Sequence, residues 1–136
     1  MAANVLADAG FLVALLNGSD RHHHWAAAQA ASLGVPWSTC EAALSEAFHI
    51  LGADNGVLLR ALLTRGAVRL AFDLGDQIEP VMKLMQKYAD VPMSLADACL
   101  VRMSEAFSDS IILTTDADFR IYRRHSRQVV PCRMPA

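Results

Sequence analysis

The sequence predicts an α/β protein of three layers, with a central, mostly parallel sheet of about five strands between helices. Short apolar runs, typical of buried strands, alternate with longer segments of helical periodicity. This alternation is typical of βαβ units, whose parallel sheets are covered on both faces. The 136 residues, of which 54% are hydrophobic and 19% charged, suit one well-buried domain, expected over residues 1–136.

The first half of the chain is predicted to hold two strands and four helices. "ANVLAD" (3–8) is a short apolar run typical of a buried strand, and "VPW" (35–37) is a second. "AGFLVALLNGSD" follows a helical pattern that stops at Asn17-Gly18, and "RHHHWAAAQAASLG" is an Ala-rich helix. "STCEAALSEAFHILG" is a helix with Ser38 and Glu41 as a capping box and Gly52 as its end, and "NGVLLRALLTRG" is the next helix.

The second half continues the alternation. "AVRLAF" (67–72) is predicted as a strand, and residues 76–89 as a helix with Pro80 in its first turn. "SLADACLVRMSEAF" (94–107) is a helix, and "SIILTT" (110–115), the most β-branched stretch, is a strand. "DADFRIYRRH" (116–125) is expected to form a short helix, and "QVV" (128–130) the last strand.

Composition excludes several classes of protein. The formal net charge of −2 leaves no global basic field for nucleic acids. Cys40, Cys99 and Cys132 are odd in number and form no CxxC pair, so neither a zinc site nor a disulfide framework is expected. The N-terminus lacks a basic region, Asp8 interrupts its apolar run, and no run is long enough to span a membrane. These features predict a cytoplasmic protein with free thiols.

Acidic residues recur where the predicted strands end. Asp8 ends the first strand, and Asp116 and Asp118 follow the strand 110–115. Asp97 lies in the first turn of a helix entered from the same edge, and Glu46 lies in mid-helix beside small alanines. Because ligands of parallel sheets bind outside the carboxyl ends of the strands, these acids are candidates for one shared site.

Each acid also has a purely structural explanation. Asp8 and Asp116 could be helix N-caps, Asp97 could be the partner of Ser94 in a capping box, and Glu46 could face solvent. Together, however, four carboxylates in one cleft would repel each other and be driven to protonate. A hard divalent cation resolves that repulsion, and a ligand set of oxygens alone selects Mg²⁺ or Mn²⁺ rather than zinc.

Four segments carry a family resemblance. They are "VLADAGFLVALLNGSDRHH" with Asp8, "TCEAALSEAFHIL" with Glu46, "MSLADACLVRMSE" with Asp97, and "ILTTDADFRIYRR" with Thr114, Asp116, Asp118 and Phe119. In this order they resemble the four motifs of PIN-domain proteins of the VapC toxin type. One departure is the pair Ala9-Gly10 after the first acid, where the family often has a hydroxyl residue.

The resemblance implies a PIN-like fold and a metal-dependent endoribonuclease that is the toxin of a toxin–antitoxin pair. It implies Asp8, Asp97 and Asp116 as ligands of Mg²⁺ or Mn²⁺ and Glu46 as a ligand through water, with Thr114 as an auxiliary residue. Asp118 could replace Asp116 as the fourth acid. The expected partners are RNA, a second copy of the chain, and a small antitoxin whose C-terminal segment bears an Arg.

Other interpretations stay open at this stage. The chain could be a PIN-domain nuclease of RNA processing without a toxin role, or a catalytically idle domain that binds RNA or protein. A phosphotransferase with an Asp nucleophile would need an acid at Gly10. No acid follows Asp118, so Arg123 and Arg124 are predicted to contact the RNA backbone. Segments 25–33, 43–51 and 57–63 offer apolar helical surface for the antitoxin.

Overall fold

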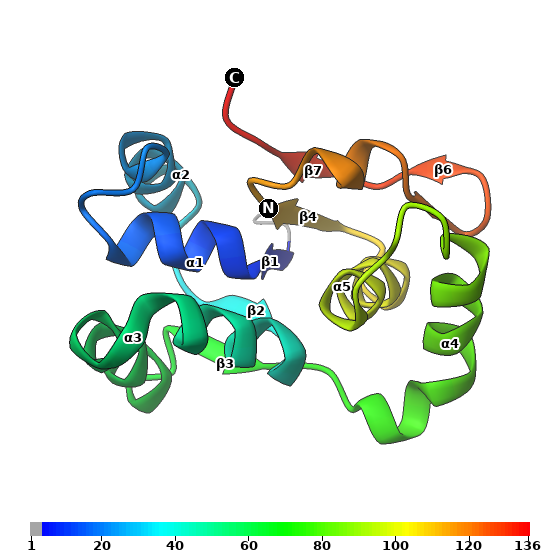
Figure 1. Ribbon diagram of the computed structural model, residues 1–136, viewed down its shortest axis with the longest axis horizontal. Coiled ribbons are helices and arrows are strands. Elements are labelled where there is room, and N and C mark those ends of the chain that lie inside the picture. Colours follow the sequence, from blue (N-terminus) through cyan, green and yellow to red (C-terminus); the bar gives the residue numbers. More distant parts are fainter. Residues whose placement is uncertain (1–3) are drawn as a thin grey trace.

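A single parallel sheet organises the protein, whose computed structural model describes residues 4–136 (Figure 1). Its strand order is β3-β2-β1-β4-β7, and every neighbouring pair is parallel. The strands are β1 (Asn4–Ala7), β2 (Trp37–Thr39), β3 (Val68–Leu70), β4 (Ser110–Leu113) and β7 (Cys132–Arg133). The predicted sheet class is therefore confirmed, although Ala3 of the first predicted strand lies outside the described residues.

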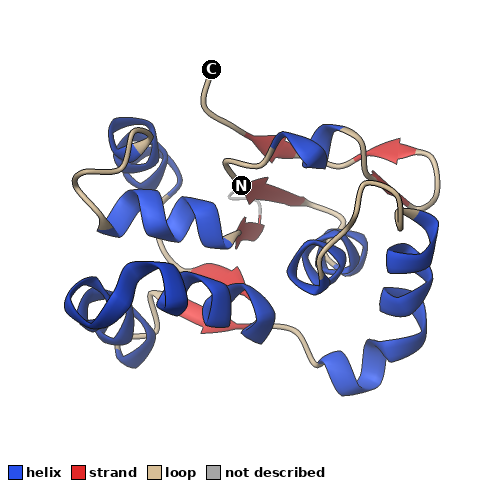
Figure 2. Cartoon of the chain, in the orientation of Figure 1, coloured by secondary structure: helices blue, strands red, loops and turns tan. Residues whose placement is uncertain are grey.

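Helices cover both faces of this sheet, which gives three layers (Figure 2). The five α-helices of residues 4–136 are α1 (Ala9–Leu16), α2 (His23–Leu33), α3 (Glu41–Thr64), α4 (Ile78–Lys87) and α5 (Leu95–Ala106). Two 3-10 turns accompany them, η1 (Leu74–Gln77) and η2 (Ala117–Arg120). In Figure 1, α1, α2 and α3 gather on one side of the strands, and α4 and α5 on the other.

Two apolar clusters follow from this layering. Val5 and Ala7 of β1 join Phe11 of α1 in one cluster, whereas Leu6, between them, joins Leu100 of α5 in the other. Alternate residues of a strand point to opposite faces, so a continuous apolar run such as that of β1 fills both cores at once.

The C-terminal segment differs from its prediction. The expected helix 116–125 is wrong, because only η2 is helical and Arg123–Arg124 forms strand β5. His125 and Ser126 have positive φ angles of 49° and 69°, which turn the chain into an antiparallel hairpin between β5 and β6 (Gln128–Val129). The strand predicted at 128–130 therefore lies outside the main sheet, whose fifth strand is β7.

The central helices also correct two details. The segments predicted as two helices, 38–52 and 55–66, form α3 with a break at Gly52, whose φ of 71° suits glycine. The capping box of Ser38 and Glu41 is wrong, because Ser38 belongs to β2 and the N-cap is Cys40, without a side-chain hydrogen bond. Within residues 4–136, no helix is long and apolar enough to cross a membrane.

Candidate active site

One cavity at the carboxyl edge of the sheet brings the predicted acids together. Its volume is about 240 Å³, and its lining contains all five acids singled out in the sequence. The lining residues are Asp8, Gly10, Glu46, Pro92, Ser94, Asp97, Thr115, Asp116 and Asp118. The acids come from four separate segments of the chain, so the fold and not local sequence creates the cluster.

Asp8 is held by two hydrogen bonds from different parts of the chain. It is the N-cap of α1, where its Oδ1 accepts from the backbone N–H of Ala9 at 2.8 Å. Its Oδ2 accepts from the Thr114 hydroxyl at 2.6 Å, and the same hydroxyl oxygen accepts from the backbone N–H of Asp116 at 3.0 Å. Thr114, predicted as auxiliary, thus links the first acid to the fourth.

Asp97 lies in the first turn of α5 and lines the cavity. The Ser94 hydroxyl accepts from the backbone N–H of Asp97 at 3.0 Å, which confirms the N-cap that the sequence indicated. The Oδ2 of Asp97 accepts from the Tyr122 hydroxyl at 2.7 Å, and hydrogen bonds from Ser94 also lower the pKa of this carboxyl group. The structural and the functional interpretations of this residue are therefore compatible.

Glu46 and the pair Asp116 and Asp118 complete the acidic wall. Glu46 is exposed in mid-helix and contributes its side chain to the cavity from α3. Asp116 is the N-cap of η2, and its Oδ1 accepts from the backbone N–H of Asp118 at 2.9 Å. Both acids of the fourth motif line the cavity, so the choice between them stays open.

Burial and then mutual repulsion raise the pKa values of three acids of the cavity. Burial, assisted by the charges of Asp97 and Glu46, raises the pKa of Asp8 to about 7 against the hydrogen bonds from Thr114 and Ala9. Burial likewise raises the pKa of Asp97, despite the hydrogen bond from Tyr122, and Asp116 adds to that shift. Partial desolvation and then Asp97 and Asp116 raise the pKa of Glu46.

No cationic side chain of the described residues neutralises this cluster. The two ion pairs within residues 4–136 are Lys83–Glu79 and Arg102–Glu105, and neither involves an acid of the cavity. Buried carboxylates that lack a cationic partner normally titrate or bind metal. The cavity is therefore large enough for a cation, and a cation would neutralise its acids.

The donor set fits a hard divalent ion that retains water. In residues 4–136, no group of three or more His, Cys, Asp or Glu side chains is placed to hold a metal by itself. Mg²⁺ commonly binds proteins through one or two carboxylates and keeps several waters, so it does not need such a group. Asp8 is the most constrained acid, since each of its oxygens already accepts a hydrogen bond.

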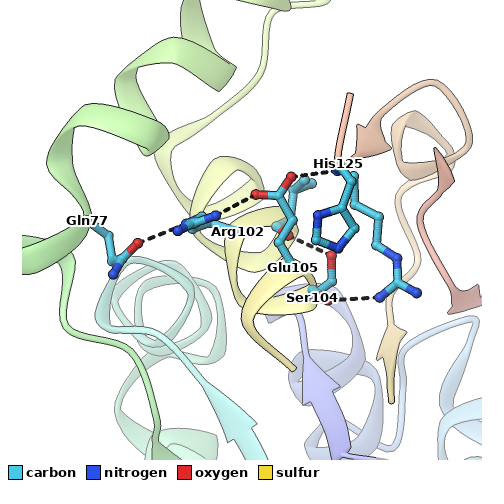
Figure 3. Close-up of polar contacts among 7 residues, drawn as sticks. Gln77, Arg102, Ser104, Glu105 and His125 are labelled. Atoms are coloured by element: carbon cyan, nitrogen blue, oxygen red, sulfur yellow. Dashed lines mark hydrogen bonds and ion pairs between the residues drawn. The ribbon is translucent and has the colours of Figure 1, made fainter. Parts of the chain in front are cut away.

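A polar network at the far end of α5 secures the hairpin that follows Tyr122 (Figure 3). Glu105 accepts from Arg102 at 3.1 Å and from the backbone N–H of His125 at 2.7 Å, and Arg102 donates to Gln77 at 2.8 Å. Arg124 Nη1 donates to the carbonyls of Ser104 and Ser108 at 2.8 and 3.2 Å. The network fixes β5 against α5.

The two arginines predicted to bind RNA are partly engaged within the protein. Arg123 Nη1 donates to three backbone carbonyls between Arg120 and Tyr122, and Arg124 fastens the end of α5. Arg123 also lines a second cavity of about 240 Å³ with Lys83 and Lys87. RNA contact by Arg123 and Arg124 stays a prediction.

Sequence reasoning missed Tyr122. Its side chain is fully buried, and its ring packs edge-on against Tyr88 and Phe119 at centroid distances of 5.1 and 5.3 Å. Its hydroxyl orients Asp97. The available signal was a tyrosine close to Phe119 in the fourth motif, because a buried tyrosine usually needs a polar partner for its hydroxyl.

Comparison with known proteins identifies the family of the chain. The PIN domain profile matches residues 5–124. The chain belongs to the PIN domain family. No sequence among curated proteins matches it. Among solved structures, this PIN domain is similar to Mycobacterium tuberculosis VapC20, described as a sarcin-ricin loop cleaving toxin, with a TM-score of 0.76 and 21% identity over 85% of this chain and 92% of that one.

The shifted pKa of Asp8 predicts how pH changes stability in excess chelator. The native state binds this proton up to about pH 7 but the unfolded state only up to its ordinary value of 3.8, so stability falls as pH rises between them. Asp8→Asn removes that loss while keeping a polar cap. At pH 8 we expect its Tm to exceed that of the wild type, by up to roughly 15 °C if the whole shift is recovered.

Calorimetry or circular dichroism across pH 3 to 8 measures this difference. It should shrink toward zero near pH 3, which lies below both pKa values, so that Asp8 is largely protonated in both states. Asp54→Asn, at an exposed acid of α3 outside the cavity, is the control and should show no comparable trend. A wild type more stable than Asp8→Asn at pH 8 would contradict the perturbed carboxyl.

Proposed function

We propose that this PIN domain is a metal-dependent endoribonuclease and the toxin of a toxin–antitoxin pair. The observation that carries the proposal is the cavity in which five acids from four segments meet without an ionic partner in residues 4–136. Phosphodiester hydrolysis in such a cavity requires a cation, since RNA adds further negative charge.

Each acid has a proposed role. Asp8, Asp97 and Asp116 hold Mg²⁺ or Mn²⁺, and Glu46 acts through water from the more exposed wall, with Asp118 beside Asp116 as an additional oxygen donor. The bound ion supplies a water of lowered pKa and neutralises charge on the phosphate. The Thr114 hydroxyl holds Asp8 and the backbone of Asp116 in fixed positions relative to each other. Tyr122 orients Asp97 by donating to its Oδ2.

The choice of RNA as substrate is supported by the fold of VapC20, whose description names it a toxin that cleaves the sarcin-ricin loop. That structure shares 21% identity with this chain, so the target of this chain is a separate question. The sarcin-ricin loop is therefore one probe among several, beside total bacterial RNA and unstructured oligonucleotides.

Asp97→Asn tests the catalytic assignment. It keeps the shape of the side chain and the backbone cap to Ser94 but removes a charge. We expect RNA cleavage to fall by about 100-fold or more, because charge stabilisation at the reacting phosphate is lost. The Tm should stay within a few degrees. Chelation of the wild type should abolish cleavage, and Mg²⁺ or Mn²⁺ should restore it.

Asp54→Asn serves as the matched control, with the same charge change outside the cavity, and should cleave like the wild type. Cleavage of total RNA is followed on gels with mapped product ends. Full activity of Asp97→Asn, or robust wild-type activity in excess chelator, would refute the metal mechanism. Binding of RNA without cleavage under any metal would favour an idle PIN domain.

The second cavity offers a place for the RNA backbone. Lys83, Lys87 and Arg123 line it, and its acid, Glu105, is already paired with Arg102. Replacing these three cations with Ala should weaken RNA binding and reduce the slope of log affinity against log salt by about two. Arg124 is left in place in this variant because it fastens α5 to the hairpin.

A triple replacement of the exposed Arg21, Arg60 and Arg65 changes the net charge equally and is the control. Fluorescence anisotropy in a salt series compares the two variants. Equal slopes for both would remove the second cavity from the RNA path.

The antitoxin and the homodimer belong to the same proposal. Ile50, Val57 and Leu58 of α3 are 57%, 48% and 48% exposed, which leaves apolar surface beside the helix that carries Glu46. An amphipathic antitoxin segment could cover it. An Arg of that segment would satisfy the acids of the cavity and compete with metal, since arginine pairs with carboxylates through two hydrogen bonds.

Expression of the chain alone should arrest bacterial growth, and Asp97→Asn should not. Co-expression with the product of the adjacent gene should relieve the arrest and yield a complex by co-purification, whereas the chain alone should elute as a dimer. Unchanged growth with wild-type protein present at the same level as Asp97→Asn would favour a nuclease of RNA processing instead.

A further inference from the structure

One hydroxyl of the acidic cavity, that of Thr115, makes no hydrogen bond within residues 4–136. Thr115 lines the cavity and is half-buried, and it lies between Thr114 and Asp116. The Thr114 hydroxyl is committed to Asp8 and to the backbone of Asp116. By contrast, none of the side-chain hydrogen bonds made within residues 4–136 involves the Thr115 hydroxyl, which leaves its proton available to a ligand.

The position of this hydroxyl depends on the absence of a side chain at Gly10. A Cβ placed at Gly10 would collide with Thr115 Oγ1, and the Thr115 Cβ would lie 3.4 Å from it. Only glycine at the second residue of α1 therefore lets the Thr115 side chain occupy this place. Both residues line the same cavity, so the missing side chain of one makes room for the hydroxyl of the other.

The backbone on either side restrains Thr115 as well. Thr114 is fully buried and bonded to Asp8, and the N–H of Asp116 is bonded to Thr114. The backbone at Thr115 is thus held in place before any ligand arrives, which lowers the cost of ordering this residue on binding.

The chemistry of the cavity indicates what it binds. Ionised carboxylates only accept hydrogen bonds, and five of them line the wall. The other lining hydroxyl, that of Ser94, accepts from the backbone N–H of Asp97 and also hydrogen-bonds the Asp97 carboxylate, whose pKa it lowers. A phosphodiester presents non-bridging oxygens that also only accept. The Thr115 hydroxyl is therefore the side-chain donor of the lining that is free to meet them.

We propose that the Thr115 hydroxyl donates a hydrogen bond to a non-bridging oxygen of the scissile phosphodiester, and that Gly10 is present to allow it. This inference rests on the proposed function, since it takes RNA as the substrate. It assigns Thr115 as a substrate-contacting residue of the reaction and Gly10 as the residue that positions it.

Thr115→Val separates this role from packing. Valine fills the same volume beside Gly10 but cannot donate a hydrogen bond. We expect kcat/KM for RNA cleavage to fall by about 10- to 100-fold with an unchanged Tm, as for loss of one donor to a reacting group. Thr115→Ser restores the donor and should recover most of the loss. Wild-type rates in Thr115→Val would overturn the inference.

A sulfur substitution identifies the contacted atom. Phosphorothioate at the mapped scissile phosphate, tested as separate diastereomers, weakens a hydrogen bond to the substituted oxygen. One diastereomer should slow the wild type more than it slows Thr115→Val, because the variant no longer makes that bond. An equal sulfur effect in both proteins would overturn direct contact with the phosphate.

The role of Gly10 is tested by stability, without any assay of cleavage. Gly10→Ala should lower the Tm in the wild-type background and lower it less in Thr115→Ala, where the colliding oxygen is gone. Additive losses would overturn the steric link and, with it, the reason given for Gly10. A wild type that cleaves no RNA would instead overturn the proposed function, whatever the outcome of the stability cycle.

Discussion

The hydrogen bond from Thr114 to Asp8 is the contact on which the arrangement of the site depends. Parallel pairing places Ala7, the last residue of β1, beside Leu113, the last residue of β4. The backbone N–H of Asp8 also donates to the Leu113 carbonyl at 3.0 Å. Asp8 and Thr114, which follow the two strands, therefore lie close together at the same edge of the sheet. Thr114 then donates to Asp8 and accepts from Asp116, which ties the start of α1 to the start of η2. The Thr114 hydroxyl thereby links Asp8 and Asp116, which are more than a hundred residues apart in the sequence.

Burying acids without cationic partners costs stability but leaves their oxygens available to a ligand. Asp8 and Asp97 are 6% and 7% exposed, and each is stabilised by hydroxyl groups in place of cations. Hydroxyls orient a carboxylate without neutralising it, so the cavity stays acidic and suited to the proposed metal. Arginine in the place of Thr114 or Tyr122 would satisfy the acids better and leave nothing for a ligand. The pKa of Asp8 is raised because burial and the neighbouring acids act on it without a cationic partner in residues 4–136.

The sequence predicts the parallel sheet, the acids and their common edge, because apolar runs ending in Asp are local signals read with one topological rule. The sequence does not predict the features that depend on contacts between distant parts of the chain. The β5–β6 hairpin depends on positive φ at His125 and Ser126, two residues without a strong turn signature, and β7 has only two residues. Tyr122 and Thr115 acquire their surroundings from residues far along the chain, so spacing alone could not identify them. The prediction of a single domain over 1–136 and the roles of the acids stay predictions.

We propose that Asp8, a buried carboxyl without a cationic partner in residues 4–136, is poised to meet a cation. Carbon-13 NMR of the side-chain carboxyl carbons, with Asp8 assigned by comparison with Asp8→Asn, measures its titration directly. Without metal, the titration midpoint should lie near 7, and saturating Mg²⁺ should lower it well below that value. A midpoint near the ordinary 3.8 without metal, or one that Mg²⁺ leaves unchanged, would contradict a raised pKa and a cation site at Asp8.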